Sequence, residues 1–356
     1  MKIAFSMARM HGGGAERVVS ELANSFAEQG HDVSIIVAKD PECVYPLKAQ
    51  VKLVDLSAKD KGILSRICAL RRCVNEKQYD VVISFLTGTN VETLMAMVGL
   101  RIPVLISERN NPYVDPKGKI YRILRAVTYP FAAGYVFQTP NAQAFFGKRI
   151  QKKSVVIMNP IIPRLPDVYH GEREKRIVNV GRLFEQKNQK MFIDAFRAFH
   201  ETHSDYIAEI YGDGPLEIEL SDYIQAKGME GAVFLRGFSK DVISAIASAS
   251  MFVMSSDYEG MSNALIEAVG MGIPCISTDH PIGGARMTIQ DGVSGYLVPV
   301  GDAQTMAEKM AKIADDAELA RRFSEQGQQL RKTLSIKVIA GQWLDYIEEI
   351  RSGGRK

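Results

Sequence analysis

The chain of 356 residues is long enough for two domains, and its content of 46% hydrophobic and 24% charged residues is ordinary for a globular protein. It contains neither the ~18 consecutive apolar residues of a membrane-spanning helix nor the apolar core of a signal peptide, and its four cysteines lack metal-ligand spacing, which together favour a cytoplasmic protein with reduced thiols. The net charge of +3 is uneven, because residues 1–160 carry 22 Lys and Arg against 13 Asp and Glu, and the remainder carries 22 against 28. This asymmetry indicates that the two halves bind different partners.

Short apolar runs recur along the first half of the chain and alternate with segments of helical period, such as residues 15–29. Strands that alternate with helices predict βαβ units and a parallel sheet. The strands predicted in this half are 2–7, 32–38, 51–56, 80–85, 103–107, 133–139 and 154–159.

Residues 159–175 are polar and proline-rich, which predicts a linker. The alternation then restarts, and a final helix is predicted at 335–351. The strands predicted in this half are 176–181, 208–212, 233–238, 251–256, 274–278 and 295–299.

The predicted fold class is therefore α/β, with two Rossmann-like doubly wound domains facing each other across a cleft. The predicted domains are residues 1–163 and 164–334. Residues 335–356 are expected to form a C-terminal helix that packs back towards the first domain.

Three glycines in MHGGGAERVV follow the first predicted strand and precede a helix. Backbone N–H groups at such a helix N-terminus suit a phosphate, which makes Gly13 and Gly14 candidate ligand-binding residues. The sequence matches neither the dinucleotide fingerprint nor a P-loop, so a tight structural turn is the alternative. Glu16 lies in the first helical turn, where the helix dipole favours a carboxylate.

Two cations follow the first strand of the second half. Arg182 comes just after this strand, and Lys187 lies at the approach to the next helix. A planar guanidinium and a flexible ammonium near a strand end suit a diphosphate. The alternative is a pair of solvated loop charges. At another strand end, Arg236 and Phe238 would flank a base, or else they are a surface arginine and a packed aromatic ring.

The stretch DYEGMSNALIEAVGMGIP (257–274) places Glu259 in a strand-to-helix turn and Glu267 within the helix. Carboxylates at such a strand end are good acceptors for sugar hydroxyls. The first helical turn, whose N–H groups lack intrahelical partners, is predicted to be Gly260, Met261, Ser262 and Asn263. The alternative is that both acids are exposed on the helix face.

Four stretches together resemble the retaining glycosyltransferases of family 4, which have the GT-B fold. They are GGGAE (12–16), GRLFEQKN (181–188), EGMSNALIEAVGMGIP (259–274) and DGVSGYLV (291–298). The Glu-x7-Glu element, from Glu259 to Glu267, is characteristic of that family. The resemblance covers nearly the whole chain and is stronger in the second half, as expected if the first domain binds a variable acceptor.

The resemblance implies a transfer of a sugar from a nucleotide diphosphate-sugar, with UDP linked to a hexose or N-acetylhexosamine as the expected donor. Arg182, Lys187 and Glu259 would be catalytic: the two cations neutralise the leaving diphosphate and the acid binds the donor sugar. Glu267 would bind the ribose, and the backbone near Arg236 and Phe238 would meet the base. The amides expected at the sugar and phosphates are those of Gly260, Met261, Ser262 and Asn263.

In the first domain, the resemblance implies that Gly13 and Gly14 close over the phosphates, and Glu16 and Arg109 complete the predicted substrate-binding set. Many family members carry a His at the end of a first-domain strand. Here LISERNNP (105–112) occupies that place, so the residues there are Glu108, Arg109 and Asn110 and not a histidine. His11 and His280 are expected to be solvated loop residues. No DxD sequence is present, so neither a metal nor another cofactor is predicted.

The implied reaction is a same-face displacement with retention, in which the leaving phosphate oxygen takes the acceptor's proton. Two alternatives remain open. One is a UDP-sugar 2-epimerase of the same architecture, although the acid, base and histidine set that it needs is not identifiable. The other is a non-catalytic subunit of a transferase complex.

The segment KGKIYRILRAVTYPF (117–131) predicts a basic amphipathic helix that suits an anionic membrane surface. The alternative is an ordinary core-facing helix with a basic solvated side. With the family resemblance, this predicts a peripheral enzyme on the inner face of the cell membrane that acts on a polyprenyl-diphosphate-linked saccharide. Nucleic acid is not predicted as a partner, because no stacking aromatics are interleaved with the cations.

Overall fold

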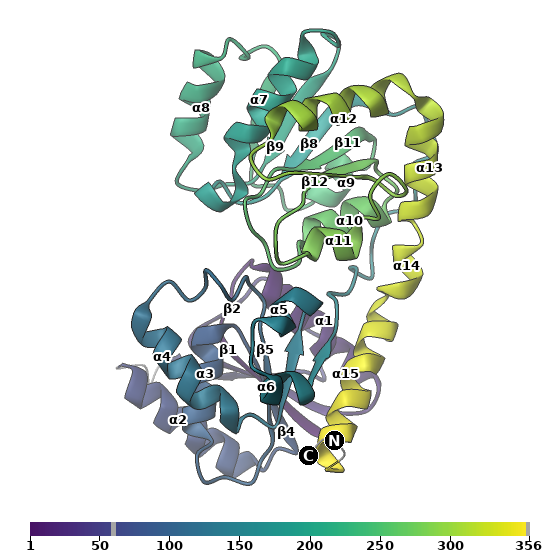
Figure 1. The fold of residues 1–356 in the computed structure, drawn as a ribbon. Coiled ribbons are helices and arrows are strands. Elements are labelled where there is room, and N and C mark those ends of the chain that lie inside the picture. Colours follow the sequence, from purple (N-terminus) through teal and green to yellow (C-terminus); the bar gives the residue numbers. More distant parts are fainter. Residues whose placement is uncertain (58–61, 354–356) are drawn as a thin grey trace. The chain divides into compact units, whose positions relative to one another are not determined.

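The computed structural model describes residues 1–57 and 62–353. The chain forms two compact units, each built around its own sheet of parallel strands (Figure 1). Unit 1 comprises Met1–Pro160 together with Ile336–Lys356, and unit 2 comprises Ile161–Ser335. The segment between the last strand of unit 1 and the first strand of unit 2 contains neither helix nor strand, as predicted for the linker.

Unit 1 has a seven-stranded sheet in the order β3-β2-β1-β4-β5-β6-β7. Its central strands are buried along their length, because helices cover both faces of a parallel sheet. The strands are β1 Lys2–Met10, β2 Asp32–Cys43, β3 Lys52–Asp55, β4 Val81–Phe85, β5 Val104–Ser107, β6 Gly134–Phe137 and β7 Ser154–Val156. The helices are α1 Gly14–Glu28, α2 Ile63–Lys77, α3 Thr87–Ala96, α4 Lys119–Thr128, η2 Tyr129–Phe131, α5 Pro140–Ala144, α6 Lys148–Lys152 and α15 Ile336–Arg351.

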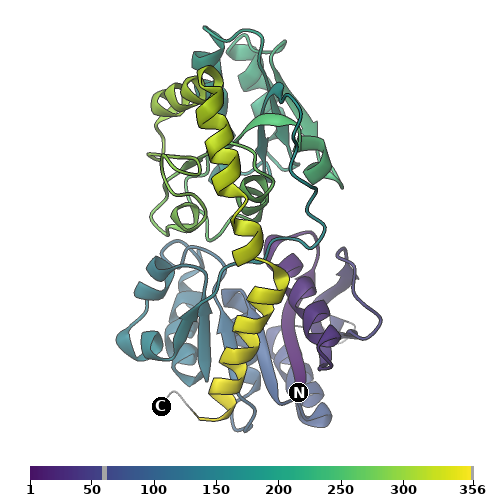
Figure 2. The ribbon, with the colours of Figure 1, turned by 90° about the vertical axis from the view of Figure 1, so that its right-hand side faces the viewer.

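The C-terminal helix α15 belongs to unit 1, where it lies beside α1 (Figure 2). Its Trp343 is fully buried and stacks on Phe85 of β4, with ring centroids 5.6 Å apart. The Tyr346 hydroxyl accepts a hydrogen bond from the Tyr135 backbone N–H at 2.9 Å. The end of the chain therefore completes the core of the unit that the beginning of the chain forms.

Unit 2 has a six-stranded sheet in the order β10-β9-β8-β11-β12-β13. The strands are β8 Glu174–Val180, β9 Ile207–Tyr211, β10 Val233–Gly237, β11 Ala249–Met254, β12 Cys275–Thr278 and β13 Tyr296–Val298. The helices are η3 Glu185–Lys187, α7 Gln189–His200, α8 Glu217–Ala226, α9 Val242–Ile246, α10 Asn263–Gly270, α11 Gly284–Thr288, α12 Ala303–Asp315, α13 Ala317–Gly327 and α14 Leu330–Thr333.

The core of unit 2 lies in two clusters of buried side chains. One contains Phe192, Phe196 and Phe199 of α7, and the other contains Leu265 and Val269 of α10. The direction of strand order reverses between β8 and β11, and doubly wound sheets bind ligands where this happens, at the carboxyl ends of the strands. The loops after β8 and β11 are therefore the first place to look for a site. Among the described residues, no helix is long and apolar enough to cross a membrane.

Candidate active site

An ion pair joins the two loops at the switch point of unit 2. The Lys187 ammonium lies 2.5 Å from Oε1 of Glu259, and the Ser256 hydroxyl donates to the same oxygen at 2.9 Å. Both side chains are largely shielded from solvent. Since Oε1 already accepts from two donors, the other carboxylate oxygen of Glu259 is the better placed to accept from a ligand.

Hydrogen bonds connect the two loops on either side of this pair. The Asn188 side chain donates to Asp257 Oδ1 at 2.7 Å, and the Asp257 backbone N–H donates to the Gln186 carbonyl at 2.9 Å. The Ser255 hydroxyl donates to the Lys187 carbonyl at 2.9 Å. These contacts fix the backbone that carries Lys187 relative to the backbone that carries Glu259, so the pair is held before any ligand arrives.

Close backbone packing under this loop requires glycine at one position. A Cβ added to Gly212 would lie 2.0 Å from the Gly181 carbonyl oxygen, and its φ of 142° lies in the region that favours glycine. The turn after β9 can therefore pack directly against the turn after β8, which contains Arg182.

Arg182 is exposed, and its guanidinium lies over the Phe184 ring at 5.0 Å. Within residues 1–57 and 62–353, no carboxylate pairs with it. The loop after β8 therefore presents one cation that is neutralised in place, Lys187, and one that is available to an anion, Arg182.

The helix α10 begins later than predicted. It starts at Asn263 with Ser262 as its N-cap, whose side chain accepts from the Leu265 N–H at 3.4 Å. Gly260 and Met261 therefore precede the helix, and the prediction that all four residues form its first turn is wrong. The backbone here is packed tightly, because a Cβ on Gly284 at the start of α11 would lie 1.9 Å from the Gly260 carbonyl oxygen.

The two acids of the Glu-x7-Glu element are both buried, Glu259 at 8% and Glu267 at 3% exposure. The alternative that they are exposed on a helix face is therefore wrong. Burying a carboxylate costs free energy unless it is paired or hydrogen-bonded. Two buried acids that follow one strand therefore indicate a candidate functional site.

Arg236 is held by an acid that the sequence analysis missed. Nε and Nη2 of Arg236 donate to Glu209 Oε1 at 2.9 and 2.6 Å, and Arg176 donates to the other oxygen at 2.6 Å. Burial opposes ionisation of Glu209, but the hydrogen bonds from Arg176 and Arg236 outweigh it and hold the pKa of this carboxyl below its ordinary value. Phe238 is 65% exposed, so the alternative of a packed ring is wrong.

His280, which follows β12, is 1% exposed, so the prediction of a solvated histidine is wrong. Burial lowers the pKa of its imidazole, whereas the nearby Glu259 carboxylate acts in the opposite sense. Neither ring nitrogen has a hydrogen-bond partner among the described residues. The site therefore includes a buried, neutral imidazole that sequence reasoning missed; its only signal was its position after a buried strand.

In unit 1, Arg109 follows β5 and is held by aromatic rings. Its guanidinium carbon lies 4.3 Å from the Phe85 ring centroid, and Nη1 donates to Asn159 Oδ1 at 2.7 Å. Burial lowers the pKa of Arg109 to about 9. Its Nε and Nη2 are shielded from solvent and have no partner in the described part of the chain.

The glycine turn of unit 1 is occupied by its own acid. Gly13 is the N-cap of α1, and a Cβ added there would lie 2.2 Å from Glu16 Oε2. The Glu16 carboxylate therefore lies at the helix N-terminus, next to Gly14, where a phosphate was predicted, and a phosphate would have to displace it.

One group of described residues has the donor atoms for a metal ion. His11, Asp40 and Glu42 each offer a ligand atom within 4.8 Å of the others, and His11 Nε2 lies 2.8 Å from Asp40 Oδ2. The group is solvent-accessible, and an ion pair accounts for the contact between His11 and Asp40.

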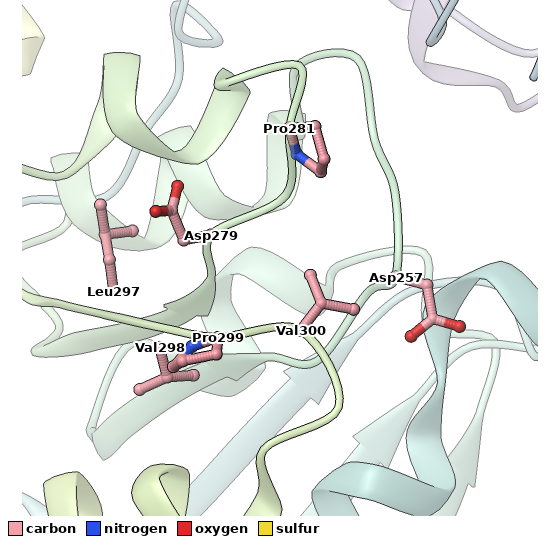
Figure 3. A pocket seen from close by; sticks show the side chains of 7 residues that line it. All are labelled: Asp257, Asp279, Pro281, Leu297, Val298, Pro299 and Val300. Carbon is pink, nitrogen blue, oxygen red and sulfur yellow. The ribbon is translucent and has the colours of Figure 1, made fainter. Parts of the chain in front are cut away.

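A pocket of about 630 Å³ opens at the carboxyl ends of β12 and β13 (Figure 3). Its acidic residues, Asp257 and Asp279, lie on opposite sides and are already engaged by Asn188 and Arg286. None of the described residues that line it belongs to the predicted site, so we assign it no role in the reaction.

Two family models match almost the whole chain. Residues 12–164 match Glycosyltransferase Family 4, and residues 166–330 match Glycosyl transferases group 1. A relative that is 30% identical over 99% of both chains supports the same assignment. The chain belongs to the family 4 glycosyltransferases, and it is an enzyme of that class.

That relative is the GalNAc-alpha-(1->4)-GalNAc-alpha-(1->3)-diNAcBac-PP-undecaprenol alpha-1,4-N-acetyl-D-galactosaminyltransferase of Campylobacter jejuni. A second protein of the same organism, 26% identical over 97% of this chain and 99% of its own, is an N-acetylgalactosamine-N,N'-diacetylbacillosaminyl-diphospho-undecaprenol 4-alpha-N-acetylgalactosaminyltransferase.

Solved structures confirm the predicted fold class. Anabaena HepE in complex with UDP has a TM-score of 0.82 at 18% identity, covering 98% of this chain and 100% of that one. The sucrose-phosphate synthase of Thermosynechococcus elongatus has a TM-score of 0.84 at 16% identity, covering 99% and 100%. The two units are therefore the Rossmann-like domains of a GT-B fold.

Proposed function

We propose that this enzyme transfers a hexose or N-acetylhexosamine from a UDP-sugar to a hydroxyl of a polyprenyl-diphosphate-linked saccharide, with retention and without a metal ion. The names of the two Campylobacter relatives support the acceptor class, since both act on undecaprenyl-diphosphate-linked sugars. The observation that carries the proposal is the buried Lys187–Glu259 pair at the switch point of unit 2.

Unit 2 binds the donor in this proposal. Arg182 and Lys187 neutralise the diphosphate as preorganised positive charge, together with the amides near the start of α10. Glu259 accepts from hydroxyls of the donor sugar, Glu267 accepts from the ribose, and the backbone beside Arg236 and Phe238 meets the base. Lys187 pairs with Glu259 and also contacts the diphosphate, so the donor binds to a cation that is already held in position.

The proposed step is a displacement on one face of the sugar. The bond from the anomeric carbon to the leaving phosphate oxygen breaks, and a bond to the acceptor oxygen forms on the same side. The acceptor's proton passes to the leaving phosphate oxygen, so no enzyme carboxylate has to act as a nucleophile. The chain's part is to hold the diphosphate and to stabilise the charge that develops on it.

Unit 1 binds the acceptor in this proposal. Arg109 has two shielded nitrogens, Nε and Nη2, that suit a phosphate or saccharide oxygen. The turn at Gly13 and Gly14 meets the phosphates once the Glu16 carboxylate has moved away from it. Glu108 and Arg109 take the place of the family histidine, with Arg109 as the ligand-contacting member.

The test is an incubation of the purified protein with UDP-glucose, UDP-GlcNAc or UDP-GalNAc, with and without an undecaprenyl-diphosphate disaccharide, in EDTA. We expect transfer with one of these donors only when the acceptor is present. Conversion of the UDP-sugar without acceptor would instead identify a 2-epimerase. Donor binding without turnover on any acceptor would identify a non-catalytic subunit.

We further propose that the enzyme is peripheral on the cytoplasmic face of the membrane and docks through α4, which lies on the outside of unit 1 (Figure 1). Four apolar side chains of α4 and η2 are exposed: Ile120 72%, Ile123 64%, Val127 59% and Phe131 79%. The alternative of a core-facing helix is therefore wrong. Exposed Lys117, Lys119 and Arg122 supply the adjacent positive charge.

Flotation with vesicles of 30% phosphatidylglycerol tests this docking. We expect the wild type to float at low salt and a double variant, Ile123→Ser with Val127→Ser, to remain in the dense fraction. Ile218→Ser is the matched control, because Ile218 is 78% exposed in unit 2. Flotation of the double variant at the wild-type level would contradict docking through α4.

A further inference from the structure

The loop from Glu108 to Asp115 is closed at its two ends by one hydroxyl. Oγ1 of Thr87 lies 3.0 Å from Glu108 Oε2 and 3.3 Å from Asp115 Oδ2. A threonine hydroxyl has one proton, so it donates to one carboxyl at a time. Inside the loop, the Val114 and Asp115 N–H groups both donate to the Asn111 carbonyl, at 3.2 and 2.9 Å. The loop that begins with the Glu108–Arg109 pair is thus a compact, self-bonded structure.

Arg125 of α4 holds this loop from the other side. Its Nη1 donates to the Asp115 carbonyl at 2.8 Å, and its Nη2 donates to the Pro112 carbonyl at 3.2 Å. The guanidinium also lies 4.9 Å from the Phe145 ring centroid, and the residue is 7% exposed. Arg125 belongs to the segment 117–131, whose basic side was predicted to face an anionic membrane. For this residue the prediction is wrong, because its guanidinium is buried and bonded inside the protein.

The same helix carries the exposed apolar side chains. Ile123 and Val127 lie two residues before and two residues after Arg125, which places them about 200° away around a helix with 3.6 residues per turn. One face of α4 therefore binds the loop, and the opposite face is the proposed membrane-docking surface.

We propose that Arg125 is a positioning residue that makes α4 and the loop 108–115 one rigid element. Docking of α4 on an anionic membrane then also holds the loop, and Arg109 within it, in its binding conformation. This inference rests on the proposed function, since it takes the membrane as the partner of α4 and Arg109 as a ligand-binding residue. It adds that the site responds to the membrane through a buried arginine that meets neither lipid nor substrate.

Arg125 can position the loop because its guanidinium donates to two loop carbonyls at once. A planar guanidinium bonds two carbonyls at once, whereas a lysine ammonium on a flexible stem cannot match both positions. If Arg125 is lost, the Pro112 and Asp115 carbonyls must find water, which they obtain most readily when the loop opens. Docking on the membrane would then order α4 without ordering the loop.

Hydrogen–deuterium exchange on the full-length protein, with and without vesicles of 30% phosphatidylglycerol, tests this. In the wild type we expect slow exchange in peptides covering 108–118 and further slowing when vesicles are added. In Arg125→Met and Arg125→Lys we expect about tenfold faster exchange in these peptides, with little further slowing by vesicles. Peptides of β4 and flotation on the vesicles should match the wild type. Arg101→Gln, on the exposed surface of unit 1, is the matched control.

Unchanged exchange at 108–118 in Arg125→Lys would overturn the inference, even if Arg125→Met fails to fold. Equal slowing by vesicles in the wild type and in the Arg125 variants would also overturn it. Failure of the wild type to float would instead defeat the proposed membrane docking. That result is distinguishable from an unchanged loop in a protein that floats.

Discussion

Two buried acids, Glu209 in unit 2 and Glu108 in unit 1, are held in opposite ways. In unit 2, Glu209 receives two arginines, which hold the pKa of its carboxyl below the ordinary value despite burial. In unit 1, Glu108 is equally buried but accepts from neutral donors on Thr87, Asn90 and Tyr129, and burial raises the pKa of its carboxyl. The surroundings of Glu209 therefore keep it charged, whereas those of Glu108 favour its protonated form.

This difference is consistent with the ligands proposed for the two units. Unit 2 has paired, fixed charges near the carboxyl ends of its strands, which is the environment that a nucleotide diphosphate needs. Unit 1 has a network of neutral hydrogen bonds around Glu108, and the next residue is a cation, Arg109, that stacks on Phe85. We expect such a network to order the loop that carries Arg109 for the proposed acceptor.

The largest expected effect is on catalysis. Lys187→Ala should lower kcat/KM for sugar transfer by roughly a hundred- to a thousandfold, about 3–4 kcal/mol, because it removes a preorganised cation from the leaving diphosphate. Steady-state kinetics with the UDP-sugar measures this.

A second lysine in the same unit provides the control. Lys190 pairs with Glu219 on the surface of unit 2, so Lys190→Ala removes an exposed lysine–glutamate pair of the same unit. We expect its kinetics to match the wild type. Equal losses in both variants would mean that Lys187 acts only through the general charge or stability of unit 2.

The next effect is on stability. Glu209→Gln should destabilise unit 2 by about 1–3 kcal/mol at pH 7, because Arg176 and Arg236 lose their shared acid while Arg176 keeps Glu174 as a partner. The loss should appear in urea unfolding followed by far-UV circular dichroism. The pKa of Glu209 is lowered in the folded state, so its stabilisation exists above the unfolded pKa of ~4.3 and disappears as pH falls through the folded value. Wild type and variant should therefore converge in acid, and a constant difference down to pH 3 would be contrary to this account.

The smallest expected effect is on the stability of unit 1, where Glu108 is the buried acid compared with Glu209. Glu108→Gln should change stability by less than ~1 kcal/mol near pH 5, since a neutral amide replaces a carboxyl whose pKa is raised. The favourable contribution of Glu108 is complete below the unfolded pKa of ~4.3 and is lost as pH rises through the folded value, so the wild type should lose stability relative to the variant as pH increases.

The chain offers a convenient probe for that measurement. Trp343 is its single tryptophan and is fully buried in unit 1, so its fluorescence reports the unfolding of this unit. A wild type that gains stability relative to Glu108→Gln with rising pH would show that Glu108 is a charged, paired acid like Glu209.

The fold was predictable because its signals are local. Each strand predicted from an apolar run is observed. Because βαβ crossovers share one hand, a reversal of strand order is what places helices on both faces of each sheet. The strands β1 and β2 extend beyond their predicted ends at Met7 and Ala38, through register shifts that no periodicity reveals. The start of α10 was misplaced because Ser262 is a cap, and residues before a cap share the composition of a first turn.

The partners of the site residues were much less predictable. Family resemblance brought Lys187 and Glu259 to one site, but not the ion pair between them, since 72 residues separate them in sequence. Glu209 looked like part of a strand, and Arg125 looked like a lipid-facing cation, because helical period gives the angle of a side chain and not what packs against it. The burial of His280, two residues after β12, depends on tertiary packing, which leaves no mark in composition.

The most direct test of the central claim is calorimetric titration of UDP in EDTA into the wild type, Lys187→Ala and Lys190→Ala. If cations and amides of unit 2 hold the diphosphate without a metal, the wild type and Lys190→Ala should bind UDP equally, and Lys187→Ala should bind at least about tenfold more weakly. Full affinity in Lys187→Ala, or binding that appears only after Mg²⁺ or Mn²⁺ is added, would contradict the account.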